Sequence, residues 1–155
     1  MTPTSTSTPS SQRGREPKGR VLIVDDEANA RAALSEILAQ EGFVTETAAD
    51  GFKALGKLEA FSPDVVLTDL RMPGMDGLEF IDKARAASPQ ACFVVMTAFG
   101  TIANAVNAMK RGAENYLTKP LDFVTMLAVV ERALEKSRLQ SENRQLRERL
   151  RERNA

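Results

Sequence analysis

The sequence predicts an α/β fold in which helices cover both faces of a parallel β-sheet. Two observations support this prediction. Short apolar runs alternate five times with segments in which apolar residues recur every three or four positions, beginning at Arg20. The apolar runs are rich in β-branched and aliphatic residues and most of them lack polar alternation, which is typical of parallel strands buried on both faces.

The first two strand–helix pairs follow from changes in the apolar period. The short run Val21–Val24 predicts a strand, and the spacing of apolar residues over 30–38 predicts a helix that Gly42 ends. Residues 43–48 then alternate between apolar and polar, as in a half-buried strand. A second helix is expected over 51–60, where one helical face is apolar.

Three further pairs complete the pattern. Residues 64–69 predict a buried strand, and Pro73, Gly74 and Gly77 force a loop directly after it. Pro89 separates the next helix from the next strand. The remaining expected elements are a helix over 78–87, a strand over 92–97, a helix over 102–111, a strand over 115–118 and a final helix after Lys119 and Pro120.

This element order leaves few possible topologies, because strand–helix–strand crossovers are right-handed. The one that fits the length is a flavodoxin-like (βα)5 doubly wound parallel sheet with strand order 2-1-3-4-5 and a C-terminal helical extension. In such sheets the carboxyl ends of the strands converge on a ligand-binding crevice. The residues expected there are Asp25, Asp26, Asp69, Thr97 and Lys119.

The amino-acid composition argues against several classes of function. The 21 basic and 21 acidic residues cancel, so no global charge favours nucleic acid or an anionic membrane. No histidine is present, which excludes catalytic triads and imidazole metal sites. Cys92 lies alone in an apolar run and is interpreted as a core residue. We find no signal segment or long apolar span, and we expect a cytoplasmic protein.

Three converging carboxylates repel one another unless a cation lies among them. Oxygen ligands favour Mg²⁺, with Asp26 and Asp69 as direct ligands, Asp25 acting through a water, and the backbone carbonyl of Arg71 completing the set. We predict that Asp69 is a nucleophile for phosphoryl groups, with Mg²⁺, Lys119 and the Thr97 hydroxyl stabilising the transferred charge. Taken singly, these residues also have simpler interpretations as a helix cap, a strand-end hydroxyl and a solvated lysine.

Four motifs at the ends of the expected strands together resemble a response-regulator receiver domain over about 20–136. They are V-D-D-E, T-D-L-R-M-P-G-M-D-G, M-T-A-F-G and Y-L-T-K-P. The resemblance implies that Asp69 accepts a phosphoryl group from a histidine kinase, that Asp25 and Asp26 bind Mg²⁺, that Thr97 is the switch hydroxyl and that Lys119 contacts the phosphate. It implies a signalling domain that phosphorylates and dephosphorylates itself, not a turnover enzyme.

The same resemblance implies an output mechanism. On phosphorylation Thr97 moves toward the phosphate and Tyr116 turns inward, which remodels the face made by the fourth helix, fifth strand and fifth helix. A simpler interpretation of Tyr116 is a half-buried strand aromatic. The family also has a cis bond at the position of Lys119 and Pro120. Arg71 and the bulky Phe99 are expected to flank the path of hydrolytic water and give a phospho-aspartate that lasts minutes or longer.

The two ends of the chain differ from the domain between them. Residues 1–19 have a Ser-, Thr- and Pro-rich composition that predicts a disordered tail, and 20–136 form the receiver-like domain. Residues 137–155 continue the last helix as an extension in which Leu139, Asn143, Leu146 and Leu150 have coiled-coil spacing. We expect a parallel homodimer. The alternatives are a solvated arginine-rich helix and a helix that contacts phosphate backbones.

The T-A-F-G-T and G-A-E-N-Y-L-T-K-P segments most resemble receivers of the nitrogen-regulatory class of enhancer-binding activators. In that class a helical linker leads to an ATPase and a DNA-binding domain, and no G-x-x-x-x-G-K-[ST] motif occurs in these 155 residues. A stand-alone regulator and one part of a larger regulator therefore both remain open. The competing functions are a phosphorylation-independent dimeriser and an aspartyl-phosphate phosphatase, although Arg71 occupies the position where such phosphatases have a second acid.

Overall fold

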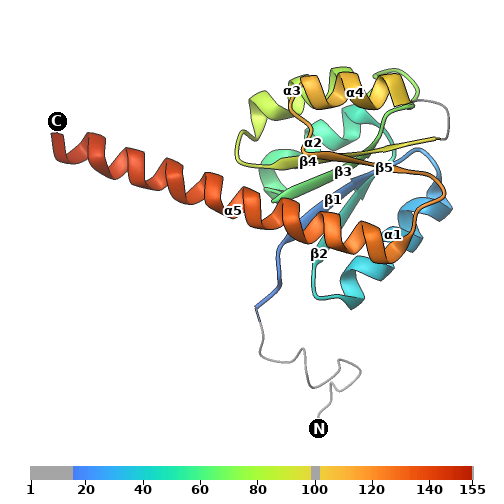
Figure 1. The fold of residues 1–155 in the computed structure, drawn as a ribbon, viewed down its shortest axis with the longest axis horizontal. Helices are drawn as coiled ribbons and strands as arrows, with labels where there is room; N and C mark the ends of the chain where they lie inside the picture. The colour runs from blue at the N-terminus through green and yellow to red at the C-terminus, as the bar shows by residue number, and fades with distance from the viewer. Residues whose placement is uncertain (1–15, 99–101, 155) are drawn as a thin grey trace, which may run out of the picture.

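The computed structural model describes residues 16–98 and 102–154, and within them it confirms the predicted α/β fold (Figure 1). The strands are β1 (Arg20–Val24), β2 (Val44–Ala48), β3 (Val65–Asp69), β4 (Cys92–Thr97) and β5 (Asn115–Thr118). The helices are α1 (Ala28–Gln40), α2 (Gly51–Phe61), α3 (Gly77–Ala87), α4 (Ile102–Lys110) and α5 (Phe123–Asn154). All neighbouring strands pair in parallel, and their order is β2-β1-β3-β4-β5.

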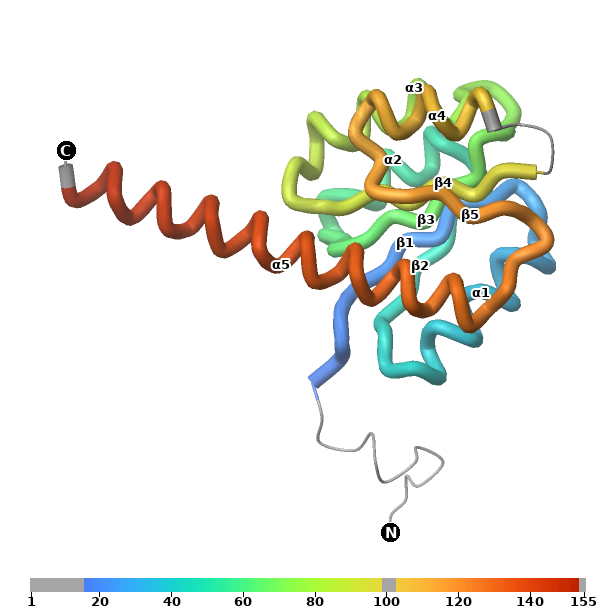
Figure 2. Tube along the Cα trace, in the orientation of Figure 1, coloured from blue at the N-terminus to red at the C-terminus, as the bar shows by residue number. Residues whose placement is uncertain are grey.

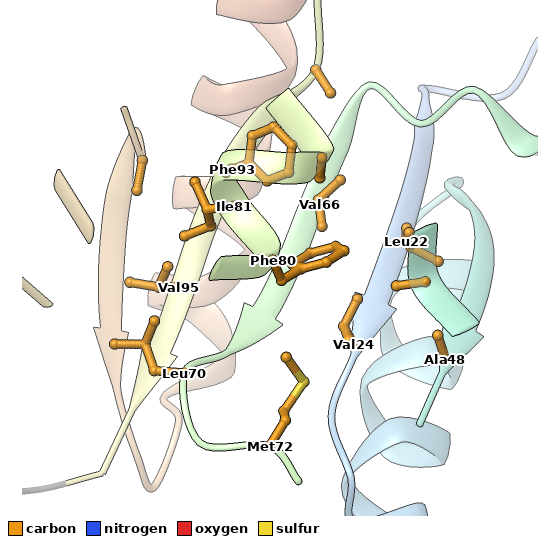
Figure 3. Packing of buried hydrophobic residues seen from close by; sticks show 14 of the residues in the cluster. Leu22, Val24, Ala48, Val66, Leu70, Met72, Phe80, Ile81, Phe93 and Val95 are labelled. Atoms are coloured by element: carbon orange, nitrogen blue, oxygen red, sulfur yellow. The ribbon is translucent and has the colours of Figure 1, made fainter. Parts of the chain in front are cut away.

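Alternate residues of the central strands point into two separate cores. Leu22 and Val66 belong to the core under α2, α3 and α4, whereas Ile23 and Leu67 belong to the core under α1 and α5. Figure 3 shows residues of the first core from several strands gathered around Phe80 and Ile81 of α3. The central strands β1, β3 and β4 must be apolar on both faces because each face is covered by helices, which explains their hydrophobic runs.

The last helix, α5, is one continuous helix of 32 residues, as predicted. Its first half packs on the sheet through Met126, Val130 and Ala133, and its second half projects away from the domain (Figure 2). At a rise of about 1.5 Å per residue the helix is about 48 Å long. Ser137, the last residue of this buried face, donates a hydrogen bond to the Gln90 carbonyl at 2.8 Å.

Two local features concern the predicted boundaries. Lys18 and Gly19, which the composition assigns to the tail, continue β1 beside the start of β2: the Lys18 amide donates to the Gly42 carbonyl and the Gly19 carbonyl accepts from the Val44 amide, both at 2.9 Å. Backbone pairing therefore extends two residues before Arg20. The bond between Lys119 and Pro120 is cis, as the resemblance implied. No helix within 16–98 and 102–154 has the length and apolarity needed to span a membrane.

Candidate functional site

Asp25 and Asp26 follow β1 directly and differ sharply in exposure. Asp25 is fully buried, its amide donates to the Ala48 carbonyl at 3.1 Å, and its Oδ1 accepts from the Glu27 amide at 2.9 Å. Asp26 is exposed and lines a cleft beside the β3–α3 loop. The turn after β1 thus holds one carboxylate rigidly inside the protein and presents the next one to solvent.

Asp69 ends β3, and its side chain is 12% exposed. Its Oδ1 accepts a hydrogen bond from the Arg71 amide at 3.1 Å, which fixes the start of the following loop. Asp25, Asp26 and Asp69 each have a carboxylate oxygen within 4.8 Å of those of the other two. The structure therefore brings together the three acids that the strand order predicted to converge.

Lys119, at the end of β5, is the cation among these acids. Its Nζ donates to Asp69 Oδ2 at 2.8 Å and to Asp25 Oδ2 at 3.0 Å. Burial alone lowers the pKa of this lysine, but the bonds to Asp69 and Asp25 outweigh that effect and raise its pKa above the ordinary value. Lys119 is thus held in the charged form and compensates part of the negative charge at the site.

Thr97 and Tyr116 lie on the neighbouring strands β4 and β5. Thr97 is 1% exposed, its carbonyl accepts from the Lys119 amide at 2.8 Å, and its hydroxyl lies 3.3 Å from the Ala98 carbonyl as a donor. Tyr116 pairs in register with Val95 and packs, half-buried, against the core under α2, α3 and α4. The predicted gate residue Phe99 lies outside the described residues.

A cleft of about 440 Å³ opens beside the acids. Its walls include Asp26, Arg71 and Met72 from the loops after β1 and β3, Asp76 at the N-cap of α3, and Asn104 of α4. Neither Asp76 nor Asn104 was predicted to line it, although Asp76 belongs to the motif T-D-L-R-M-P-G-M-D-G, because local sequence does not show which side chains border a cleft. The cleft gives a small charged group direct access to the side of the acidic cluster that contains Asp26.

The simpler interpretation of the acidic run as a helix cap fits the structure in position but not in side-chain bonding. Glu27 is the N-cap residue of α1, and it forms no side-chain capping hydrogen bond. The oxygens of Asp25 instead bond to Glu27 N and Lys119 Nζ. Three carboxylates make a hard, oxygen-only donor set, which fits Mg²⁺ by ligand chemistry.

Sequence reasoning also missed Arg31 on α1. Its Nη1 donates to the backbone carbonyl of Asp25 at 2.8 Å. A signal was available, since a cation in the first turns of a helix is disfavoured by the helix dipole unless negative charge lies nearby. Asp25, Asp26 and Glu27 supply that negative charge.

The sequence matches a protein family and resembles several curated proteins. Residues 21–131 match the model of the response regulator receiver domain. The chain is 40% identical over 127 residues to the regulatory protein AtoC of Escherichia coli strain K12, covering 82% of this chain and 28% of AtoC. It is 39% identical over 117 residues to the DNA-binding transcriptional regulator NtrC of Salmonella typhimurium, covering 76% of this chain and 25% of NtrC.

A solved structure agrees with these matches. A response regulator receiver domain protein from Clostridium thermocellum superposes with a TM-score of 0.74 at 28% identity, covering 78% of this chain and 98% of that one. The chain therefore spans 25–28% of the length of these two curated relatives, whereas it covers nearly all of this solved receiver.

Proposed function

The chain belongs to the response regulator receiver domain family, and from that membership we propose that Asp69 accepts a phosphoryl group from a histidine kinase or phosphotransfer protein in a Mg²⁺-dependent reaction. The observation that carries the proposal is Lys119, bonded to Asp25 and to Asp69 within a cluster of three carboxylates. Such a cluster binds a divalent cation, and its lysine can contact an anionic group that reaches Asp69.

Each residue has a defined part in the proposed reaction. A carboxylate oxygen of Asp69 attacks phosphorus, an acyl-phosphate bond forms, and the bond from phosphorus to the donor imidazole breaks with its electron pair left on nitrogen. Lys119 Nζ and the Thr97 hydroxyl contact phosphoryl oxygens. Asp26, Asp69 and the Arg71 carbonyl would hold Mg²⁺ directly and Asp25 through a water, and the ion would neutralise charge on the phosphoryl group.

Phosphorylation is then proposed to shift a two-state equilibrium. Thr97 moves toward the phosphoryl group and Tyr116 turns inward, which changes the surface of α4, β5 and α5. Two observations support this proposal: Thr97 is buried at the end of β4, the strand that pairs with β3 up to Asp69, and Tyr116 is only half-buried on β5.

The proposed output is control of transcription in the cytoplasm. NtrC, a relative of this chain, is a DNA-binding transcriptional regulator and extends well beyond the receiver. Since α5 projects beyond the receiver, it is placed to connect the phosphorylation site to a downstream effector protein or domain. In this function the chain is a signalling switch and not a turnover enzyme.

The proposal is tested by incubating the protein with acetyl phosphate and Mg²⁺ and measuring its intact mass. We expect one added phosphoryl group that disappears in Asp69→Asn and in EDTA. Asp50→Asn is the matched control, because Asp50 caps α2 and is not one of the three clustered acids, and asparagine caps equally well.

Two other results would overturn the proposal. No added mass in the wild-type protein favours the phosphorylation-independent dimeriser. The exposed leucines of α5 would then form the dimer without any chemistry at Asp69. Continuous consumption of acetyl phosphate by a protein that stays unmodified favours an aspartyl-phosphate phosphatase.

A further inference from the structure

Arg31 is a cation near the site that the proposed reaction does not use. It lies on α1, one turn after the N-cap Glu27, and it is half-buried. Its backbone amide donates to the Glu27 carbonyl at 3.0 Å, and its guanidinium Nη1 reaches back to the Asp25 carbonyl at 2.8 Å. The side chain therefore links α1 back to the end of β1 across the turn between them.

The position of Arg31 indicates a role in the acidic turn rather than in the helix. The positive end of the helix dipole disfavours a cation close to an N-terminus. No acidic side chain lies in the first turn of α1 to offset this, and Glu27 does not cap the helix with its side chain. The compensating interaction is the bond to the Asp25 carbonyl, within the run of acids that precedes the helix.

This bond completes the restraint of Asp25. The amide of Asp25 is held by the Ala48 carbonyl, its Oδ1 by the Glu27 amide and its Oδ2 by Lys119. Its carbonyl, the last group before Asp26, is held by Arg31. Loss of this contact would free the peptide that joins Asp25 to Asp26, although all three carboxylates would still be present.

We propose that Arg31 is a positioning residue for magnesium binding, which it promotes by holding the peptide between Asp25 and Asp26 in the ion-binding conformation. This inference rests on the proposed function. Residues that orient metal ligands typically change affinity about tenfold or more when they are removed. A positioning role predicts that affinity for Mg²⁺ weakens, while the reaction at saturating Mg²⁺ is preserved.

The test compares Arg31→Gln with the wild-type protein by calorimetric titration with Mg²⁺. We expect the dissociation constant to rise by about tenfold. The rate of phosphorylation by acetyl phosphate should fall by the same factor at limiting Mg²⁺ and return to the wild-type value at saturating Mg²⁺. Arg31→Lys keeps the charge and a donor, and it should bind Mg²⁺ more tightly than Arg31→Gln.

Arg20→Gln is the matched control. Arg20 begins the same strand that Asp25 follows, and its Nε donates to the Phe61 carbonyl at 2.6 Å, so it makes a similar contact at the opposite end of β1. This variant should leave the Mg²⁺ dissociation constant unchanged even where it lowers the melting temperature.

Three outcomes would overturn the inference alone. They are an unchanged dissociation constant in Arg31→Gln, tighter binding through relief of charge repulsion, and a reaction rate that stays low at saturating Mg²⁺. Failure of the wild-type protein to bind Mg²⁺ would overturn the proposed function and this inference together.

Discussion

Lys119 determines how the acidic cluster is stabilised when no metal is bound. Asp25 is fully buried, and a buried carboxylate without a partner is strongly destabilising. Lys119 bonds to Asp25 and Asp69 at once, so its charge offsets the repulsion between them. A divalent cation among the same acids would have the same electrostatic effect.

Lys119→Gln should therefore lower the free energy of unfolding in EDTA by about 1–3 kcal/mol, since Asp25 loses its charged partner. Urea denaturation in EDTA and in Mg²⁺ checks this, and the difference from wild type should shrink when Mg²⁺ is present. Lys57→Gln is the control, because Lys57 forms an exposed pair with Glu46 that should contribute under about 1 kcal/mol. An equal loss with and without Mg²⁺ would contradict the expectation.

Cys92 supplies a prediction about pH. Burial raises the pKa of its thiol to about 11, with a smaller contribution from Glu114. Because the folded pKa lies above the ordinary thiol value of 9.0, the stabilisation is fully present below about pH 9 and is lost as pH rises through 11. The expected loss is about 2–3 kcal/mol once the thiol has ionised in both states.

The measurement is urea denaturation from pH 8 to 11 of the wild type and of Cys92→Ala. Other groups titrate in both proteins, so only the difference between the two curves reports the thiol. That difference should be constant near pH 8 and should move in favour of Cys92→Ala as pH rises. Parallel curves over the whole range would show that burial does not disfavour the thiolate in the folded protein.

At the scale of elements, the loop between β3 and α3 is tightly packed at Gly77. A Cβ atom there would lie 2.6 Å from the Asp69 carbonyl oxygen and 2.6 Å from Leu70 Cα, and neither backbone atom can move independently of the site. Gly77 also donates its amide to the Leu70 carbonyl at 2.8 Å. The position of Asp69 therefore depends on the absence of a side chain eight residues later.

Gly77→Ala should lower the free energy of unfolding by about 2–3 kcal/mol through overpacking and should slow phosphorylation of Asp69. Gly56→Ala is the control, because nothing lies within 4 Å of a Cβ built in the middle of α2. This second variant should stabilise the protein by about 0.5–1 kcal/mol without any effect on phosphorylation. Chemical denaturation and intact-mass kinetics of both proteins test the pair.

The strands and the convergence of the acids were predictable because both depend on local patterns. Continuous apolar runs mark strands buried on two faces, and the topology then brings their carboxyl ends together. The contacts of long side chains were not predictable in this way. Arg31 reaches the Asp25 carbonyl, and Arg85 donates to the Arg111 carbonyl while Arg111 pairs with Asp82, through rotamers that local sequence does not specify.

On the scale of the whole molecule, α5 presents two opposite faces. Met126, Val130 and Ala133 lie against the sheet, and Ser137 continues this face with its bond to Gln90. Leu146 follows Ser137 by nine residues, about two and a half turns, and so lies on the other side of the helix. We call the outer stripe the leucine seam; it comprises Leu139, Asn143, Leu146 and Leu150.

The leucine seam supports the proposed parallel homodimer. Its three leucines are 53–56% exposed in the single chain, although the other residues over 138–154 are all polar. In a parallel pair, Glu142 of one chain would face Arg147 of the other, five positions along, and their charges are complementary. Since the seam points away from the sheet, two helices can pair without displacing α5 from either receiver domain.

Leu146→Glu should convert the protein to a monomer at micromolar concentrations, because it places two carboxylates opposite each other in the middle of a short seam. Light scattering after size exclusion measures this change. Gln145→Glu is the control, since it adds the same charge one position away from the seam and should leave the mass unchanged. A wild-type protein that is monomeric at every concentration and in both phosphorylation states would contradict the proposed dimer.

Asn143→Ile should have the opposite effect and strengthen association between the chains. Asparagine at such a position specifies a two-stranded register at a cost in stability, so its replacement should tighten association and relax the number of strands. Sedimentation equilibrium should then detect species larger than the dimer at high concentration. If the variant instead stays dimeric with unchanged affinity, Asn143 does not lie in the interface and the dimer uses a different face of α5.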